Sequence, residues 1–257
     1  MMEFGLNLYS LRNLIKTEEA FLDTAIKLRK MGYSFLQYSG GPYDADMITR
    51  VSQRSGMPVV LTHVPTQRIV DDTDALMEEH SRFGCRNIGL GAMDRALIPN
   101  KEALYAEIEK LENAGKKMAE KGYKFFYHNH HFEFFKHGDE TVLDYMIKNA
   151  PHINFTLDTF WVQFGGASIA DVVDKLAGRI ECVHLKDYKL FENKDALAGF
   201  EPRFAPVGDG TIDFKSLIPK MQAAGVKYFL VEQDNAADLP DPLGQVERSI
   251  KYLKENF

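Results

Sequence analysis

The chain has 257 residues, 45% of them hydrophobic and 26% charged, which is the composition of a globular protein with a full core. Its formal net charge of -6 argues against a protein that binds a nucleic acid backbone, because such proteins usually present a basic face. With only two cysteines, the chain is not expected to be a disulfide-rich protein. The first residues lack the basic start and apolar run of a signal peptide, which argues against a secreted protein. No apolar run approaches the roughly 18 residues of a membrane span, which argues against a membrane protein. We therefore expect no disulfide framework, no membrane association and a cytoplasmic location.

Short apolar runs typical of strands alternate with longer amphipathic stretches along the whole chain. Strands are expected at 3–9, 33–38, 58–64, 86–91, 124–128, 153–157, 180–186 and 227–233. Helices are expected at 18–32, 42–56, 71–83, 101–122, 140–150, 168–178, 214–224 and 243–256. Asp213 is suited to cap the seventh of these helices, and Pro219 inside it predicts an early kink or a late start.

Eight strand–helix units in alternation predict the fold class. Alternation with mostly apolar strands implies a parallel sheet, and eight units imply that the sheet closes into an α/β (β/α)₈ TIM barrel. A doubly wound open sheet is the alternative, but it usually has a glycine-rich phosphate turn after its first strand, and LYSLRN is not such a turn. Since no linker or low-complexity segment interrupts the chain, we expect one domain over 1–257.

The predicted strands end in residues that can bind ligands, and the C-terminal ends of barrel strands form the working face of such folds. Strands five to eight end in His128, Asp158, His184 and Glu232. Because neighbouring strands lie about 4.8 Å apart, these four side chains can converge on one ion. Two imidazoles and two carboxylates suit one divalent metal ion such as Mn²⁺, Zn²⁺ or Co²⁺. The alternative is that each is a strand-end polar residue whose hydrogen bonds are satisfied by a loop.

Four segments carry a resemblance to a known family. They are FTLDTFWV (155–162), CVHLKDY (182–188), PVGDGTIDF (206–214) and FLVEQD (229–234). With them the whole chain resembles the sugar phosphate isomerase/epimerase family of xylose isomerase-like barrels, which includes ketose 3-epimerases, inosose dehydratases and endonuclease-IV-type nucleases. The resemblance implies metal-ligand roles for Asp158, His184 and Glu232.

The chain departs from the family pattern at two positions. The family usually has a glutamate after the fifth strand, in a context similar to E-N-H, where this chain reads H-N-H and has His128, followed by His130. Trp161 stands where the ketose epimerases have a histidine. A metal-bound histidine is a poor general base, so Glu232 is the clearest base, with a role as metal ligand alone as the alternative. A second base would have to come from Glu133, Lys186 or His130.

Like His130, four further residues are candidates for contacts with a substrate. Lys186 is expected to hold a substrate oxygen, and His63, at the end of the third strand, to contact a hydroxyl group. Trp161 is expected to cover an apolar sugar face, and Arg203 to face the substrate from a loop. Each has a structural alternative: a surface lysine, a histidine at the core edge, aromatic packing or a loop arginine.

The resemblance implies a divalent-metal-dependent isomerase or epimerase for a sugar or keto-sugar, which removes a proton next to a carbonyl through a metal-stabilised enediolate. A lyase of the inosose dehydratase type is the alternative, because one base suffices for loss of a β-hydroxyl group. A nuclease would need more metal ligands and a basic face, and a non-catalytic sugar-binding barrel is a fourth hypothesis. We expect a small-molecule partner, no nucleic acid, and a homodimer or homotetramer.

Overall fold

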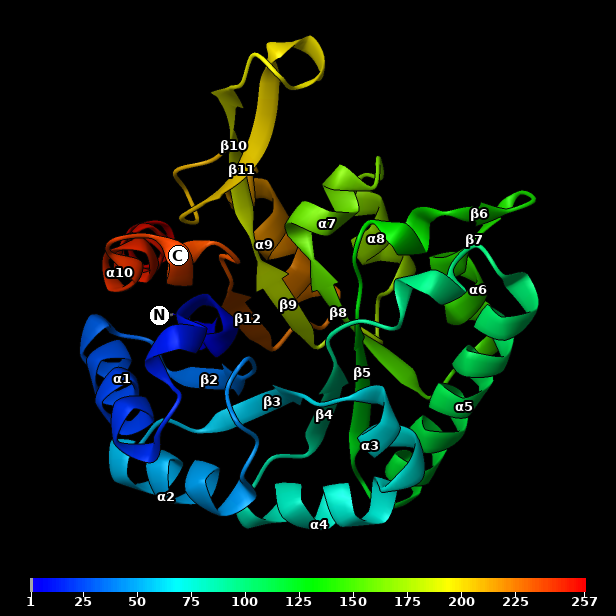
Figure 1. Ribbon diagram of the computed structural model, residues 1–257, viewed down its shortest axis with the longest axis horizontal. Helices are drawn as coiled ribbons and strands as arrows, with labels where there is room; N and C mark the ends of the chain where they lie inside the picture. Colours follow the sequence, from blue (N-terminus) through cyan, green and yellow to red (C-terminus); the bar gives the residue numbers. More distant parts are fainter. Residues whose placement is uncertain (1) are drawn as a thin grey trace.

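The computed structural model describes residues 2–257, and a closed barrel of eight parallel strands lies at the centre of this part of the chain (Figure 1). The barrel strands are β1 (Gly5–Asn7), β2 (Phe35–Tyr38), β3 (Val59–His63), β4 (Asn87–Leu90), β5 (Lys124–His128), β8 (Ile153–Asp158), β9 (Cys182–Leu185) and β12 (Tyr228–Val231). Strands that are consecutive in this list pair in parallel, and β1 pairs with β12 to close the barrel. The predicted TIM barrel is confirmed.

Helices surround the barrel and cover its outer surface (Figure 1). They are α1 (Glu18–Met31), α2 (Ala45–Ser55), α3 (Thr66–Asp71), α4 (Thr73–Arg82), α5 (Lys101–Glu120), α6 (Val142–Asn149), α7 (Thr159–Phe164), α8 (Ile169–Lys175), α9 (Phe214–Ala223) and α10 (Pro242–Asn256). Short 3₁₀ turns add η1 (Leu8–Leu14), η2 (Arg95–Leu97), η3 (Phe132–Phe134), η4 (Leu197–Gly199) and η5 (Ala236–Asp238). None of the helices described is both long and apolar enough to cross a membrane.

The helices differ from the predicted ones in three places. The helix predicted over 71–83 corresponds to α4, and the additional helix α3 precedes it; the two are separated at Asp72, whose φ of -115° lies outside the helical range. Helix α9 begins directly after Asp213, whose carboxylate accepts from the backbone N–H of Ser216 at 3.3 Å, so the late start expected from Pro219 does not occur. The short helix α7 directly after β8 was not predicted.

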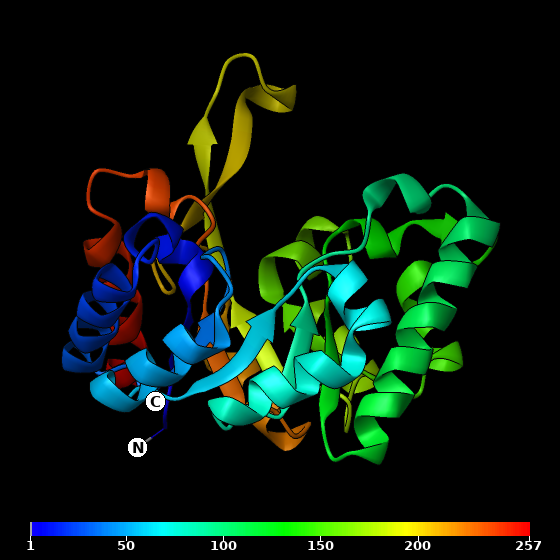
Figure 2. The same ribbon diagram turned by 60° about the horizontal axis from the view of Figure 1, so that its bottom comes forward.

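Two antiparallel hairpins extend the barrel at its C-terminal end. The smaller pairs β6 (Lys136–His137) with β7 (Glu140–Thr141). The larger pairs β10 (Asp187–Glu192) with β11 (Phe200–Ala205) and stands well away from the barrel (Figure 2). Its tip exposes apolar side chains, with Leu197 97% exposed. The sequence predicted only a loop here.

Candidate metal centre

Strand register places the predicted ligands on one face. His128 is in register with Thr156 on β8, and Asp158 is in register with His184 on β9. Because side chains alternate along a strand, residues two apart share a face, so the ends of β5, β8 and β9 all point into the barrel. The same parity applies on β12, where Leu230 is level with His184 and Glu232 follows two residues later.

An apolar layer lies directly below these residues. Phe126, Cys182 and Leu230 precede His128, His184 and Glu232 by two positions, and they belong to one buried cluster inside the barrel. The barrel is therefore filled beneath the site, and the polar side chains form its uppermost layer.

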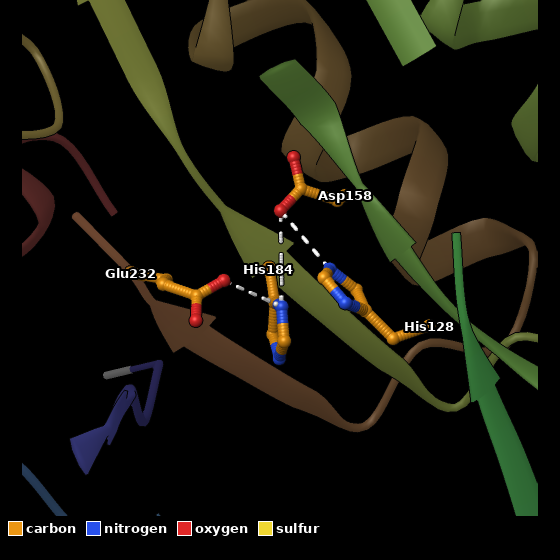
Figure 3. Close-up of side chains that lie close together, drawn as sticks. All are labelled: His128, Asp158, His184 and Glu232. Carbon is orange, nitrogen blue, oxygen red and sulfur yellow. Dashed lines mark hydrogen bonds and ion pairs between the residues drawn. The ribbon is translucent and has the colours of Figure 1, made fainter. Parts of the chain in front are cut away.

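The four predicted ligands come together as one buried group (Figure 3). One donor atom from each of His128, Asp158, His184 and Glu232 lies within 4.8 Å of the others. Nε2 of His128 is 3.2 Å from Oδ2 of Asp158. Nδ1 of His184 is 2.9 Å from Oε2 of Glu232 and 3.8 Å from Oδ2 of Asp158.

Outer hydrogen bonds orient both imidazoles. His128 donates from Nδ1 to the carbonyl of Gly91 at 2.9 Å, and His184 donates from Nε2 to Oε1 of Gln37 at 2.7 Å. Burial lowers the pKa of His128 well below its ordinary value, so this ring is neutral and its Nε2 has no proton to donate. The inward nitrogen of His128 therefore directs its lone pair towards Oδ2 of Asp158, an arrangement that a cation between them would stabilise.

The two carboxylates are oriented in the same way. Oδ1 of Asp158 caps helix α7 by accepting from the backbone N–H of Trp161 at 2.9 Å, which leaves Oδ2 facing the group. Oε1 of Glu232 accepts from Nδ2 of Asn7 at 2.6 Å, which leaves Oε2 facing the group. Each of the four residues thus has one atom held from outside and one directed inward. Two nitrogen and two oxygen donors with oriented partners fit a divalent metal ion.

Lys186 places a positive charge beside this group. Its Nζ lies 2.8 Å from Oδ2 of Asp158, 2.8 Å from Oε2 of Glu232 and 2.9 Å from Oδ1 of Asp234. Burial lowers the pKa of Lys186, but the three carboxylates outweigh it and hold this pKa well above its ordinary value, so the ammonium stays charged. Apart from the histidines, the site has an excess of two negative charges, which one divalent ion would balance.

A cavity of about 300 Å³ opens above the group at the C-terminal end of the barrel. Its lining residues are Tyr9, Ser39, His63, Gly91, Ala92, His128, His130, Lys186, Glu232 and Asp234. The cavity therefore joins part of the cluster to further polar side chains, as a small-molecule site requires.

A comparison with known proteins identifies the family. The model of the xylose isomerase-like TIM barrel matches residues 27–256. The chain belongs to this family. A curated relative, inosose dehydratase from Geobacillus thermodenitrificans, is 30% identical over 183 residues, which cover 64% of this chain and 60% of that protein. The match to this family member thus spans about 60% of its length.

Solved structures of other proteins share the fold of the whole chain. A sugar phosphate isomerase/epimerase from Parabacteroides distasonis has a TM-score of 0.80 at 18% identity, covering 98% of this chain and 93% of that one. An L-ribulose 3-epimerase has a TM-score of 0.71 at 15% identity, covering 100% and 94%. At these identities the likeness concerns the fold alone, whereas the match to the family model confirms the resemblance inferred from the sequence motifs.

Three of the other predicted site residues line the cavity: His63, His130 and Lys186. His130 stacks on Phe132 with ring centroids 5.1 Å apart, and burial lowers its pKa to about 2. Trp161 lies behind His130, with ring centroids 5.2 Å apart, and does not belong to the cavity lining.

Two more predicted residues lie outside the cavity. Glu133 is fully buried and accepts hydrogen bonds from the Tyr127 hydroxyl and, at 2.7 Å, from the backbone N–H of His130. Burial raises the pKa of Glu133 to about 7. Arg203 lies on β11, where it pairs with Glu201 at 2.6 Å. A direct catalytic role for Glu133 and a substrate contact for Arg203 thus remain predictions without support from their positions.

The structure also gives roles to three residues for which the sequence indicated none. Asp234 lines the cavity, and Asn7 and Gln37 orient Glu232 and His184. The spacing of two residues from Glu232 to Asp234 is the signal that would have placed Asp234 on the same side. The roles of Asn7 and Gln37 depend on contacts between strands distant in sequence, which spacing does not reveal.

Proposed function

We propose that the protein is a divalent-metal-dependent isomerase or epimerase that removes a proton next to the carbonyl group of a sugar or keto-sugar. The observation that carries this proposal is the convergence of His128, Asp158, His184 and Glu232 at the cavity, each with one donor atom directed inward. A bound divalent ion would supply Lewis-acid polarisation of the carbonyl, which makes the neighbouring C–H group more acidic. The epimerase among the structural relatives supports this reaction class.

Glu232 is the residue assigned to accept the proton. Burial raises its pKa, but Lys186 and His184 outweigh this and hold the pKa of Glu232 well below its ordinary value, so the group is an ionised carboxylate at neutral pH. Asn7 fixes the orientation of this carboxylate at the cavity. Lys186 stands beside it, where its ammonium would stabilise negative charge that develops on a substrate oxygen.

Neutral histidines would bind substrate hydroxyl groups around this centre. Burial lowers the pKa of His63 well below its ordinary value, as it does for His130. Within residues 2–257, Nε2 of His63 and Nδ1 of His130 have no hydrogen-bond partner although both are buried. A buried polar atom without a partner is costly, and a hydroxyl-rich substrate would supply the missing hydrogen bonds.

A lyase of the inosose dehydratase type is the second candidate. The curated relative with this name supports it, as does the position of Glu133 outside the cavity, which leaves no second glutamate there among the described residues. Glu232 would take the proton next to the carbonyl, and the hydroxyl group on the next carbon would leave with a proton from Lys186 as water. One base is sufficient for this elimination.

Metal analysis followed by proton exchange in D₂O tests both candidates. The protein loaded with Mn²⁺ is incubated with a panel of keto-sugars and inosose, and products are followed by mass spectrometry and NMR. An isomerase or epimerase should incorporate deuterium next to a carbonyl, whereas a lyase should yield a product that has lost one water. Glu232→Gln should abolish either reaction, and Glu192→Gln on the exposed hairpin is the matched control. Absence of both exchange and water loss throughout the panel would contradict the proposal.

A further inference from the structure

Lys186 and the candidate metal ion share two of their acceptor atoms. Oδ2 of Asp158 and Oε2 of Glu232 lie 2.8 Å from Nζ of Lys186, and the same two oxygens face the inward nitrogens of the imidazoles. An ammonium and a divalent ion repel each other strongly at such distances in a buried site. The ammonium therefore has to move from at least one of these oxygens when an ion is bound.

Asp234 is the third acceptor of the ammonium, and it is not among the four grouped ligands. Its Oδ1 lies 2.9 Å from Nζ, and within residues 2–257 Lys186 is the one cation paired with this carboxylate. The backbone carbonyl of Asp234 accepts from Nη1 of Arg12 at 2.7 Å, which fixes the chain without engaging the carboxylate. Asp234 also lines the cavity, so an ammonium held there would face the substrate.

Aromatic rings limit where the ammonium can move. Nζ of Lys186 lies 5.4 Å from the ring centroid of Trp161 and 5.6 Å from that of Phe204. These faces attract a cation but offer no hydrogen-bond acceptor. A displaced ammonium that is almost wholly buried needs such an acceptor, and Asp234 provides one without a move away from the cavity.

We propose that Asp234 is a positioning residue that holds the Lys186 ammonium at the cavity while a divalent ion occupies Asp158 and Glu232. The inference rests on the metal site of the proposed function. Without Asp234, the ammonium has only the two metal-ligand carboxylates as partners, so it competes with the ion for them. With Asp234, the site keeps two separate positive centres, the ion and the ammonium, for two oxygens of the substrate.

Manganese affinity in a double-mutant cycle tests this role without any assay of activity. Titration calorimetry of chelator-treated protein with Mn²⁺ should show about tenfold weaker binding for Asp234→Asn and near-wild-type binding for Asp234→Glu. Lys186→Met should bind Mn²⁺ more tightly than wild type, because the competing ammonium is gone. In the Lys186→Met background, Asp234→Asn should weaken binding by less than about threefold. An equal or larger loss in that background would show that Asp234 acts through its charge alone and would overturn the inference.

Asp238→Asn is the matched control for charge. Asp238 lies four residues further along the same segment and pairs with Arg12 instead of Lys186. Asp238→Asn removes the same negative charge as Asp234→Asn but no partner of Lys186, so Mn²⁺ affinity should remain within about twofold of wild type. A loss as large as that of Asp234→Asn would contradict the specific role of Asp234.

A crystal structure of the wild-type protein with Mn²⁺ gives a second measurement that does not depend on folding of a variant. Nζ of Lys186 should remain within hydrogen-bond distance of Asp234 and lose its contact with Asp158, Glu232 or both. Mn²⁺ bound by the four ligands with Nζ away from Asp234 would overturn this inference alone. Failure of Mn²⁺ to bind at these four residues would overturn the metal site and this inference with it.

Discussion

Single residues at the site are oriented by partners that lie outside the ligand group. Gln37 is the clearest example, because its side-chain carbonyl accepts from His184 and thereby directs Nδ1 of His184 towards the two carboxylates. Gln37 lies on β2, which is far from β9 in the sequence. Such partners fix both the tautomer and the direction of a ligating ring, so their loss affects metal binding although they touch no metal.

Replacement of Gln37 by leucine should therefore weaken Mn²⁺ binding. The variant leaves His184 without its hydrogen-bond acceptor, and we expect a loss of affinity of about 10- to 100-fold. Titration calorimetry measures it, with Gln163→Leu on the exposed surface of α7 as the control. Unchanged affinity in Gln37→Leu would show that His184 does not need this orientation.

Glu133 predicts a pH-dependent difference in stability. Its pKa is raised by burial from 4.5 to about 7, so the folded state holds the proton more tightly than the unfolded state. The stabilisation is therefore complete below about pH 4.5 and is lost as the pH rises through 7, by roughly 3 kcal/mol over that window. Glutamine has no such titration, and it can still accept from the His130 N–H and donate to the Tyr127 hydroxyl.

Urea unfolding of wild type and Glu133→Gln at pH 5 and pH 8 checks this sign. The variant should gain stability relative to wild type between the two pH values, by roughly 2.5 kcal/mol. Comparison within one protein pair cancels the titration of the other groups. Glu255→Gln at the exposed end of α10 should show no such change. A difference between wild type and Glu133→Gln that is the same at both pH values would contradict the raised pKa.

Elements were predictable from the sequence where a periodic apolar pattern decides the structure. All eight barrel strands were found, since their apolar runs are bounded by polar turns, but several are shorter than predicted. In β1 the strand ends at Asn7, because the Asn7 side chain accepts from the backbone N–H of Tyr9 and starts η1. The strand-end ligands were predictable for the same reason as the strands, because parity and register follow from the β pattern.

The larger hairpin was not predictable from its sequence. β10 starts after a single residue beyond β9, and the side chains of its outer half, from Leu190 to Glu192, are wholly or partly exposed. Its strands pair with each other, with Glu192 opposite Phe200. Pairing of this kind depends on contact between two segments and leaves little signal in either one.

Shortening this hairpin should leave the barrel intact. Residues 193–199 are replaced by Asn-Gly, so that a two-residue turn connects the paired residues Glu192 and Phe200. Two-residue turns of this type suit hairpins. Because the tip is exposed, the free energy of unfolding should change by at most about 0.5 kcal/mol, which corresponds to roughly 1–2 °C in Tm. Calorimetry measures the shift, and a fall of about 5 °C or more would show that the tip stabilises the barrel.

At the scale of the whole molecule, the site connects strands that are far apart in the chain. The four candidate ligands come from β5, β8, β9 and β12, and the outer partners Asn7 and Gln37 come from β1 and β2. The site thus includes contacts between both halves of the barrel, directly above its packed apolar interior. The single domain over 1–257 remains a prediction from the sequence, and so does the homodimer or homotetramer.

Because the unfolded chain cannot bring these strands together, an ion that binds the site should stabilise the entire fold. At a free Mn²⁺ concentration of about 100 times its Kd, the expected gain is about 2.7 kcal/mol, or roughly 5–10 °C in Tm for a chain of this length. Differential scanning calorimetry with Mn²⁺ and with a chelator measures it, and His184→Ala should abolish the shift. The chelated wild type should still unfold cooperatively, because Lys186 partly neutralises the carboxylates that the ion would otherwise pair with. A Tm that does not respond to Mn²⁺, or that responds equally in His184→Ala, would contradict a metal site at the end of these strands.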